Sequence, residues 1–456
     1  MDENEFDEDL FGDFLEEKPS EPDDFLEEEF EKVENTLEEP EEKPRKKPAA
    51  KKSQKEPEIS DESTEPESEN PPVKTPVAKK KPSSKDEFSG EFSRDSLIEA
   101  TSWVSKLAAS DTQFSLLFRN NIVTLFGESS TSFLQYPLEG LHCSGTLEAS
   151  IPVEFVRSLG QVLKHADDDT VRLTADKNGV FFNLSDRELH CERFVTQVNI
   201  PESAKTLGTV SQGEFFTALK IISTFVEASS LAMPVFQGIH IRESKGKLTV
   251  MASDNTIFGE MTIPMDGEDW TKPYLITKDL ASAGSTSETD FVDIVLQEDT
   301  QRFGVRFNDG RLCLFAMIQA DPIDFHASLQ QALKEEKHSL TVGVKQFGQA
   351  VSDIQLIDPY HGATVKLKLP KSGTTHMVIS GMKSGSQIKA PVQDSTADKA
   401  VDITFNGGEL LKCLSGVLSE NIRMEFTDGV HSVFVKRLLS DGEPDEDSLF
   451  VIAPLT

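Results

Sequence analysis

The chain has 456 residues, more than one compact core holds, so two to four domains are expected. Its formal net charge of -33 at pH 7 argues against tight binding of nucleic acid through a broad basic surface, because such binding requires Lys and Arg to neutralise phosphates. The acidic N-terminal region and the lack of a long apolar run argue against an export signal and a membrane span, so we expect a soluble cytoplasmic protein.

Residues 1–92 differ in composition from the rest of the chain and are expected to form a disordered tail. Residues 1–90 contain 30 acidic and 14 basic side chains and 11 of the 23 prolines, and this composition cannot bury enough apolar surface to offset chain entropy. Asp9-Leu10-Phe11 sets an aromatic residue among acids and could dock on a partner as a short peptide. The alternative is a solvated acidic tail, whose basic stretches at 45–52 and 79–81 contact phosphate weakly or serve only as linker.

After this tail, one unit of a helix, a strand, a tight turn and a returning strand recurs three times. In the last copy the apolar residues have helical spacing over 410–418 and alternate over 422–426, and the turn is at Asp428-Gly429. The same three features occupy 156–163, 171–173 and Asn178-Gly179 in the first copy, and 278–283, where the helix is weaker, 292–296 and Asp309-Gly310 in the middle copy.

Another helix precedes each unit, and these leading helices are expected over 96–108, 213–226 and 344–354. The sequence therefore predicts an α+β fold of three tandem domains, each with two helices on antiparallel sheets. Each domain has an ordinary size, and the expected bounds are 93–205, 206–335 and 336–456.

No catalytic residue, metal site or cofactor is expected. The sequence lacks the C-x-x-C, H-E-x-x-H, G-x-x-x-x-G-K-[ST] and G-x-S-x-G patterns, and its nine histidines are scattered. The cysteines lie far apart in or beside apolar runs, which is typical of buried reduced thiols: Cys143, Cys191, Cys313 and Cys413.

Particular segments resemble the bacterial DNA sliding clamps, the DNA polymerase III β subunit family. Gly238-Ile239-His240-Ile241 followed by the run 247–254 resembles a hairpin of the second clamp domain. The C-terminal segments 405–406, 420–430 and 450–455 are still more similar. The resemblance covers roughly residues 93–456 and is weakest in the first domain.

This resemblance implies a non-catalytic processivity factor that encloses double-stranded DNA and tethers a DNA polymerase to it. Three clamp domains would form a crescent, and a head-to-tail homodimer would close a ring with helices around the hole. Enclosure would hold DNA without many phosphate contacts, which agrees with the acidic charge. A clamp loader is a further implied partner.

The resemblance also places a cation on each inner helix, which would make the lumen mildly positive. The alternative is that these side chains are ordinary exposed lysines and arginines of helix surfaces. The expected DNA-facing residues are Lys106, Arg157, Lys164, Lys220, Lys278, Lys345 and Lys412.

Clamps of this family bind partner peptides in a hydrophobic groove between the second and third domains. Asn255-Thr256-Ile257-Phe258 replaces the usual Gly-His-Arg-Leu, and the segment around Pro322, Ile323 and Phe325 follows the family pattern only loosely, so an altered peptide specificity is expected. The alternative for the C-terminal residues is an ordinary buried strand, which would account for every second residue. The expected groove residues are Phe236, Ser253, Asn255, Thr256, Ile257, Phe258, Asn406, Val430, Ser432, Val451, Ile452, Ala453, Pro454 and Leu455.

Two other functions stay open at the level of the sequence. A clamp-derived adaptor acting in transcription or DNA repair would use the tail as its contact. An enzyme would need a constellation of residues that the sequence does not display.

Overall fold

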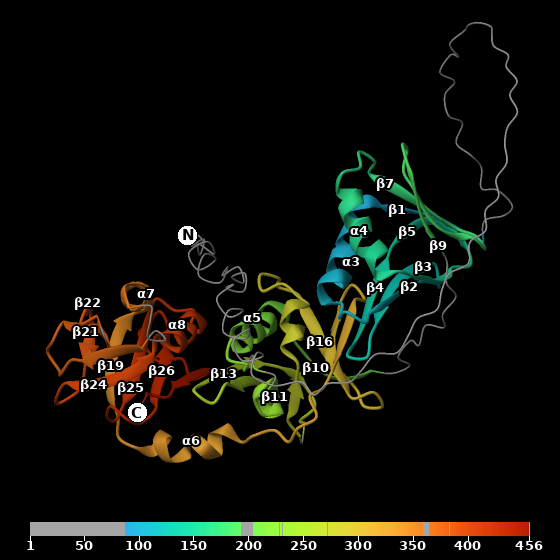
Figure 1. The fold of residues 1–456 in the computed structure, drawn as a ribbon. Helices are drawn as coiled ribbons and strands as arrows, with labels where there is room; N and C mark the ends of the chain where they lie inside the picture. Colours follow the sequence, from blue (N-terminus) through green and yellow to red (C-terminus); the bar gives the residue numbers. More distant parts are fainter. Residues whose placement is uncertain are drawn as a thin grey trace, which may run out of the picture. The chain divides into compact units, whose positions relative to one another are not determined.

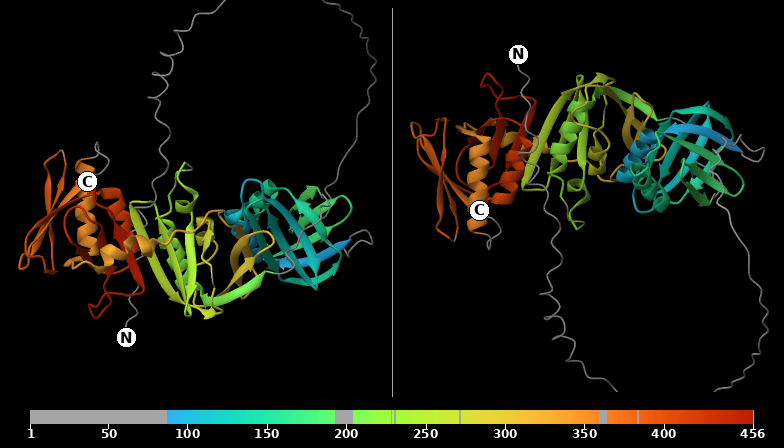
Figure 2. Two further views of the ribbon diagram at one scale, coloured as in Figure 1. Left: turned by 90° about the horizontal axis from the view of Figure 1, so that it is seen from below. Right: turned by 90° about the horizontal axis from the view of Figure 1, so that it is seen from above.

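The computed structural model describes residues 87–192, 204–358 and 364–455, apart from positions 228, 230, 271 and 383. The chain divides into residues 1–80 and 81–456, and every described residue belongs to the second unit. The expected tail up to residue 86, with Asp9-Leu10-Phe11 and the basic stretches, therefore lies outside the described residues. The described elements form three α+β domains in chain order (Figures 1 and 2), which confirms the predicted fold class.

The first domain starts with a strand that runs directly into a helix. Ser93 ends this strand and caps the helix, since its Oγ accepts a hydrogen bond from Ser96 N at 3.5 Å. A meander and a second helix follow, and a last hairpin returns to pair with the first strand. The elements are β1 (Phe88–Ser93), α3 (Arg94–Leu107), β2 (Gln113–Arg119), β3 (Ile122–Glu128), β4 (Ser132–Leu138), β5 (Gly140–Gly145), β6 (Glu148–Ile151), α4 (Val153–Lys164), β7 (Thr170–Ala175), β8 (Gly179–Asn183) and β9 (Glu188–Glu192).

The second domain repeats this order, with a 3-10 helix in place of the second α-helix. The meander of three strands packs against the first helix of the domain, and its central strand is buried on both faces. The elements are β10 (Lys205–Ser211), α5 (Gln212–Ser223), η2 (Pro234–Phe236), β11 (Ile239–Ser244), β12 (Lys247–Ser253), β13 (Ile257–Pro264), β14 (Asp266–Gly267), β15 (Tyr274–Ile276), η3 (Lys278–Ser282), β16 (Phe291–Gln297), β17 (Arg302–Phe307) and β18 (Leu312–Ala316).

A linker helix, α6 (Phe325–Lys334), leads into the third domain, which has both of its expected helices. Asn406 caps the second of them, since its Oδ1 accepts from Gly408 N at 2.9 Å and from Glu409 N at 3.3 Å. The elements are β19 (His338–Gly343), α7 (Val344–Ile357), β20 (Thr364–Leu369), β21 (His376–Gly381), β22 (Gln387–Pro391), β23 (Asp394–Ser395), β24 (Val401–Asn406), α8 (Gly407–Gly416), β25 (Asn421–Phe426), β26 (Val433–Arg437) and β27 (Ser448–Ile452).

The first domain begins earlier than residue 93, the expected boundary. Phe88 and Phe92 on β1 are each 1% exposed, and β1 pairs with both β5 and β7. The Phe88 ring lies 5.1 Å from the ring of Phe118. A lysine- and proline-rich run directly precedes β1, so the sequence alone does not separate its short alternation of apolar and polar residues from the tail. Residues 88–92 therefore belong to the first domain and not to the tail.

The middle copy has the predicted weak helix, as the 3-10 helix η3, but differs from the prediction in its turn. The helix η3 has five residues and buries only Leu280, so it lacks the apolar stripe that an α-helix would bury. The turn after β16 lies at 298–301, where Gln301 has a φ of 52° and its N–H donates to Glu298 O at 3.3 Å. Asp309-Gly310 closes the next hairpin, between β17 and β18, so its predicted equivalence to Asn178-Gly179 is wrong.

Two nine-stranded sheets cross the boundaries between domains. In one, β4 of the first domain pairs antiparallel with β18 of the second, with Phe133 opposite Leu314. In the other, β13 of the second domain pairs with β27 of the third, with Phe258 opposite Val451. The other two sheets each lie within one domain, and β9 and β22 are edge strands of these sheets.

The helices of the three domains contact one another in the order α4, α3, η3, α5, α8 and α7, and each also packs against a sheet. Their apolar residues join one hydrophobic cluster that extends through all three domains. This continuous row of helices, together with the shared sheets, is the framework for the sites below. In the described part of the chain, no helix is both long and apolar enough to cross a membrane.

Candidate functional site

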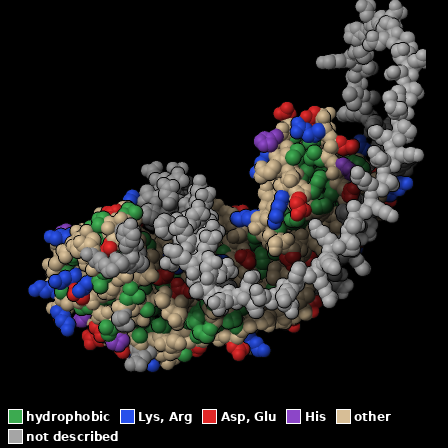
Figure 3. Space-filling view, viewed as in Figure 1, with side chains coloured by type: hydrophobic (Ala, Val, Ile, Leu, Met, Phe, Trp, Pro, Cys, Tyr) green, Lys and Arg blue, Asp and Glu red, His purple; other side chains and the backbone are tan. Residues whose placement is uncertain are grey.

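Six of the seven predicted DNA-facing cations are exposed and form no ion pair with any described residue: Lys106, Arg157, Lys164, Lys220, Lys278 and Lys345. They lie on α3, α4, α5, η3 and α7, all members of the helix row. Lys412 on α8 differs, because its Nζ lies 3.1 Å from the carboxylate of Glu409 and 3.9 Å from that of Asp254. Figure 3 shows acidic and basic side chains interspersed on the part of the face that it describes.

The structure brings three of these cations together. Lys106, Lys220 and Lys278 line one hollow of about 420 Å³ where α3 of the first domain meets α5 and η3 of the second. Arg157, Lys164 and Lys345 lie on helices at the two ends of the row and do not line it.

A second hollow, of about 230 Å³, lies between the second and third domains. Its lining combines apolar side chains with the hydroxyl-bearing residues Ser253, Thr256, Ser328 and Ser432. Such a mixture suits a small number of apolar anchors held in register by a few polar contacts. Nine of the 14 predicted groove residues line it: Phe236, Ser253, Asn255, Thr256, Ile257, Phe258, Ser432, Val451 and Ala453.

The other five predicted groove residues do not line this hollow. Asn406 caps α8, and Val430 lies 59% exposed in the turn before β26. Ile452 is 1% exposed and joins the core cluster, whereas its neighbour Val451 faces the hollow, as the alternation of a strand requires. Pro454 and Leu455 lie beyond β27, and Leu455 N donates to Thr404 O at 2.8 Å.

The linker helix α6 supplies a wall of the hollow that the sequence did not assign to it. The four additional lining residues are Ile323, Phe325, Ser328 and Leu329. Phe325 packs 5.1 Å from the ring of Phe258, and Asp324 caps α6 by accepting from Ala327 N at 3.1 Å. The signal was present, since an N-cap aspartate precedes apolar residues four positions apart, Phe325 and Leu329.

His326 fixes α6 to the sheet beneath it. Its Nε2 lies 2.7 Å from Glu260 Oε2 on β13, and both side chains are at most about a third exposed. On the apolar side, Phe325 also meets the ring of His240 edge-on at 4.9 Å. The wall is therefore held at both faces, so the hollow is formed before any ligand binds.

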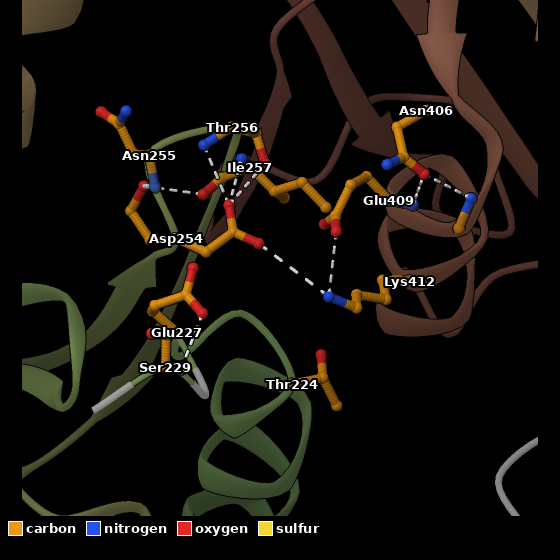
Figure 4. Close-up of polar contacts among 12 residues, drawn as sticks. Thr224, Glu227, Ser229, Asp254, Asn255, Thr256, Ile257, Asn406, Glu409 and Lys412 are labelled. Atoms are coloured by element: carbon orange, nitrogen blue, oxygen red, sulfur yellow. Dashed lines mark hydrogen bonds and ion pairs between the residues drawn. The ribbon is translucent and has the colours of Figure 1, made fainter. Parts of the chain in front are cut away.

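The loop 253–257, between β12 and β13, forms the rim of the hollow and is held by its own side chains (Figure 4). Asp254 Oδ1 accepts from Thr256 N at 2.9 Å, from Thr256 Oγ1 at 2.7 Å and from Ile257 N at 2.8 Å. Ser253 Oγ donates to Ile257 O at 2.7 Å. Asn255 has a φ of 77°, a left-handed conformation that asparagine tolerates better than most residues.

The other oxygen of Asp254 faces the third domain, where Glu409 and Lys412 approach it from α8 (Figure 4). Burial raises the pKa of Asp254, but the hydrogen bonds from Thr256 and Ile257 leave that pKa below its ordinary value. Burial and the charge of Asp254 raise the pKa of Glu409, although Lys412 opposes them. The junction of the second and third domains thus holds two carboxyl groups and one ammonium group.

The described residues contain no group of three His, Cys, Asp or Glu side chains that could hold a metal ion. The four cysteines form no disulfide; Cys191, Cys313 and Cys413 are buried, and burial raises the pKa of each of these thiols.

Solved structures of sliding clamps match this architecture over nearly their whole length. The DNA polymerase sliding clamp from Bacillus subtilis has a TM-score of 0.70 and 16% identity, with 81% of this chain and 99% of that chain covered. The DNA polymerase III β subunit from Thermotoga maritima has a TM-score of 0.68, 13% identity and the same coverage. The chain has the bacterial sliding-clamp fold.

A further sliding clamp, from Pseudomonas aeruginosa and bound to griselimycin, gives a TM-score of 0.70 at 14% identity, and again 81% of this chain and 99% of that chain are covered. No family model matches the sequence, and no curated protein matches it either. The predicted resemblance to the bacterial sliding clamps is therefore confirmed at the level of the fold, while the sequence is only 13–16% identical to these three clamps.

Proposed function

We propose that this chain is a sliding clamp, a non-catalytic subunit that encloses duplex DNA and tethers a DNA polymerase to it. The observation that carries the proposal is a repeated seam. The third strand after the first helix of one domain pairs with the third strand after the second helix of the next, as β4 with β18 and β13 with β27. Each seam extends a sheet from one domain into the next.

The same rule predicts how a ring would close. The strands that would form a third seam are β22 of the third domain and β9 of the first, and both are edge strands in this chain. A second copy placed head to tail would pair its β9 with β22 of the first, and the reverse contact would close the ring. Edge strands expose unpaired backbone groups, and such a seam would satisfy them.

The cations of the helix row support DNA as the enclosed molecule. The row carries six cations without an acidic partner among the described residues, although the whole chain has a formal charge of -33. A duplex surrounded by these helices would meet a few cations at a time and would otherwise be repelled, which favours sliding over adhesion.

The hollow between the second and third domains is the proposed site for partner peptides from a polymerase and from a clamp loader. Its apolar floor of Phe236, Phe258 and Val451 would take a Leu-Phe type anchor. The wall from α6 and the sequence Asn255-Thr256-Ile257-Phe258 support a peptide specificity that differs from that of other sliding clamps.

Enclosure can be tested on a duplex that is attached to a bead at one end and carries biotin at the other. The full chain is first allowed to thread over the free end, and streptavidin then blocks that end. At about 1 M salt the Debye length falls to about 3 Å, so adhesion through charge is lost while a threaded ring stays.

We expect retention on the blocked duplex, loss from the unblocked one, and release when a restriction enzyme cuts the blocked duplex. Equal loss from both duplexes would contradict the proposal. Capture of RNA polymerase or repair proteins in place of DNA polymerase on immobilised chain would instead favour an adaptor.

A further inference from the structure

We infer that the hollow lined by Lys106, Lys220 and Lys278 is a discrete binding site for backbone phosphates of the enclosed DNA. The inference rests on the proposed clamp function and adds to it a defined point of contact. The volume of about 420 Å³ falls within the range of small-molecule pockets, roughly 300–1,000 Å³, so it has room for a phosphodiester segment.

The charge in the hollow is unbalanced. None of the three lysines forms an ion pair with a described residue, and Asp279 is the only acid in the lining. The Asp279 carboxylate accepts a hydrogen bond from Thr277 Oγ1 at 2.8 Å. Three unpaired cations around one hollow repel each other, and an anion with several oxygens would relieve that repulsion.

Hydroxyl groups complete the chemistry of a phosphate site. Ser282, Ser285 and Thr286 also line the hollow, and hydroxyls commonly donate to phosphate oxygens in complexes with DNA. Ser223 lines it too, but its hydroxyl donates to Lys220 O at 2.7 Å. No aromatic or large aliphatic side chain lines it, so an apolar ligand would find no surface to bury against.

A simpler explanation for lysines at these positions covers only part of the cluster. Lys106 and Lys220 lie in the last turns of α3 and α5, where a cation compensates the negative end of the helix dipole. Lys278 is the first residue of η3, where a cation has no such benefit. Compensation of helix ends therefore does not explain why Lys278 faces the same hollow as the other two.

The walls of the hollow come from two domains and are fixed relative to each other. Trp103 Nε1 on α3 donates to Ala283 O, just after η3, at 2.7 Å. The Trp103 ring meets the ring of Phe307 edge-on at 6.1 Å, and the guanidinium of Arg311 lies 4.6 Å from the centre of the Phe307 ring. These contacts hold α3 against the second domain, so the helices that carry the lysines are positioned before DNA arrives.

The junction of the second and third domains lacks such a site. There Lys412, on the second helix of its domain as Lys278 is, lies beside the carboxylates of Glu409 and Asp254. A phosphate would have to displace these acids. Each chain would therefore bind DNA phosphates at the junction of its first and second domains, but not at the junction of its second and third domains.

The test measures binding of the full chain to a short duplex by fluorescence anisotropy over a range of salt concentrations. The triple variant Lys106→Gln, Lys220→Gln, Lys278→Gln removes the cluster. A control triple, Lys368→Gln, Lys371→Gln, Lys399→Gln, removes the same charge from exposed lysines that form no ion pair with a described residue and lie outside the helix row. Thermal melting verifies that both variants fold.

We expect the cluster variant to lower the slope of log K against log salt by about one for each lysine, hence by about three. The control triple should lower it by less than about one. Equal slopes for the cluster variant and the parent, or equal losses in both triples, would overturn the inference.

Protection of lysines from acetylation, read by mass spectrometry, separates the sources of phosphate. Duplex DNA should protect Lys106, Lys220 and Lys278 but not Lys368, whereas inorganic pyrophosphate at the same phosphate concentration should protect them less. Protection by pyrophosphate alone would assign the hollow to a small phosphate compound and overturn the inference. If the parent is retained on blocked DNA but the cluster is unprotected, the phosphate site fails and the clamp stands.

Discussion

Asp254 and Lys412 link the peptide hollow to the helix row, because the Asp254 carboxylate holds the loop beside the hollow through Oδ1 and lies 3.9 Å from the Lys412 ammonium through Oδ2. Lys412 belongs to α8, a member of the helix row, and its Nζ also lies 3.1 Å from the Glu409 carboxylate. A charged group that approaches Lys412 from the helix row would therefore also act on Asp254, the carboxylate that holds the loop beside the peptide hollow.

Glu409→Gln is expected to raise the melting temperature at neutral pH. The folded-state pKa of Glu409 is raised, so its ionised form costs stability above that pKa, and the cost disappears as the pH falls through the raised pKa towards the ordinary pKa of a glutamate. Glutamine removes the charge, and its amide nitrogen can donate to Asp254, which an ionised carboxylate cannot do. The advantage of the variant should shrink as the pH is lowered from 8, measured in dilute solution at pH values above the isoelectric point near 4.6.

Glu420→Gln is the control for this experiment, since Glu420 is exposed and forms no ion pair with a described residue. Its melting temperature should follow that of the parent at every pH. A Glu409→Gln variant that is less stable than the parent at pH 8 would show that the bond to Lys412 outweighs the crowding of the two carboxyl groups.

Leu329→Ala is expected to weaken binding of a synthetic peptide with a Leu-Phe anchor without unfolding the chain. Leu329 lines the hollow from α6, and truncating an anchor contact of this kind costs about 1–2 kcal/mol, roughly a five- to thirty-fold loss of affinity. Leu333→Ala is the control, because Leu333 lies one turn further along α6, is 39% exposed and does not line the hollow. Isothermal titration of both variants would reject the hollow as the peptide site if they lose affinity equally.

Deletion of residues 1–86 is expected to raise the affinity for the same peptide if Asp9-Leu10-Phe11 competes for the hollow. The competition is intramolecular or between two copies, so a tail peptide added in trans to the truncated chain should restore it at high concentration. Unchanged affinity after the deletion would remove the tail as an occupant and leave it as a solvated acidic segment.

The sequence was informative where periodicity decides the structure and less so where packing does. The helical spacing over 410–418 and the alternation over 422–426 became α8 and β25, because a buried stripe or face repeats along the chain. The sheet seams could not be predicted, since β4 and β18 are far apart in sequence and pair through backbone groups that every residue carries.

The candidate sites divide in the same way. Segment resemblance located nine residues of the hollow, but α6 was missed because a linker carries no repeat to compare with. Lys412 resembles the other cations as a sequence position, and only the fold shows that Asp254, far away in the chain, lies beside it. Similarly, the cluster of Lys106, Lys220 and Lys278 depends on contacts between two domains.

Gly284→Ala is expected to destabilise the chain by about 1–3 kcal/mol, because a Cβ there would lie 2.1 Å from the ring of Phe216 and the core would have to shift. Gly348→Ala is the matched control, and its expected effect on the free energy of unfolding has the opposite sign. On α7 the new Cβ would meet its nearest neighbour, Leu414, only at 3.9 Å, so roughly 0.5–1 kcal/mol of stabilisation is expected from reduced chain entropy. Denaturant unfolding of both variants measures the change in the free energy of unfolding. An unchanged free energy for Gly284→Ala would mean that Phe216, beside the lysine hollow, can shift without cost.

Lys389→Glu is expected to weaken self-association if β22 pairs with β9 of a second copy. Glu188, His190 and Glu192 share one exposed face of β9, and Lys389 lies on an exposed face of β22. A glutamate at 389 would place like charges across the seam, and such contacts cost more than about 1 kcal/mol, so the dissociation constant should rise at least about fivefold.

A charge exchange makes this prediction specific to the proposed seam. Adding Glu188→Lys and Glu192→Lys to Lys389→Glu should restore self-association in sedimentation experiments, because opposite charges again face each other. Lys368→Glu, an exposed change on the interior strand β20 of the same sheet, should leave self-association as in the parent. If Lys389→Glu and Lys368→Glu behave alike, β22 does not form the seam, and ring closure has to be sought at another edge.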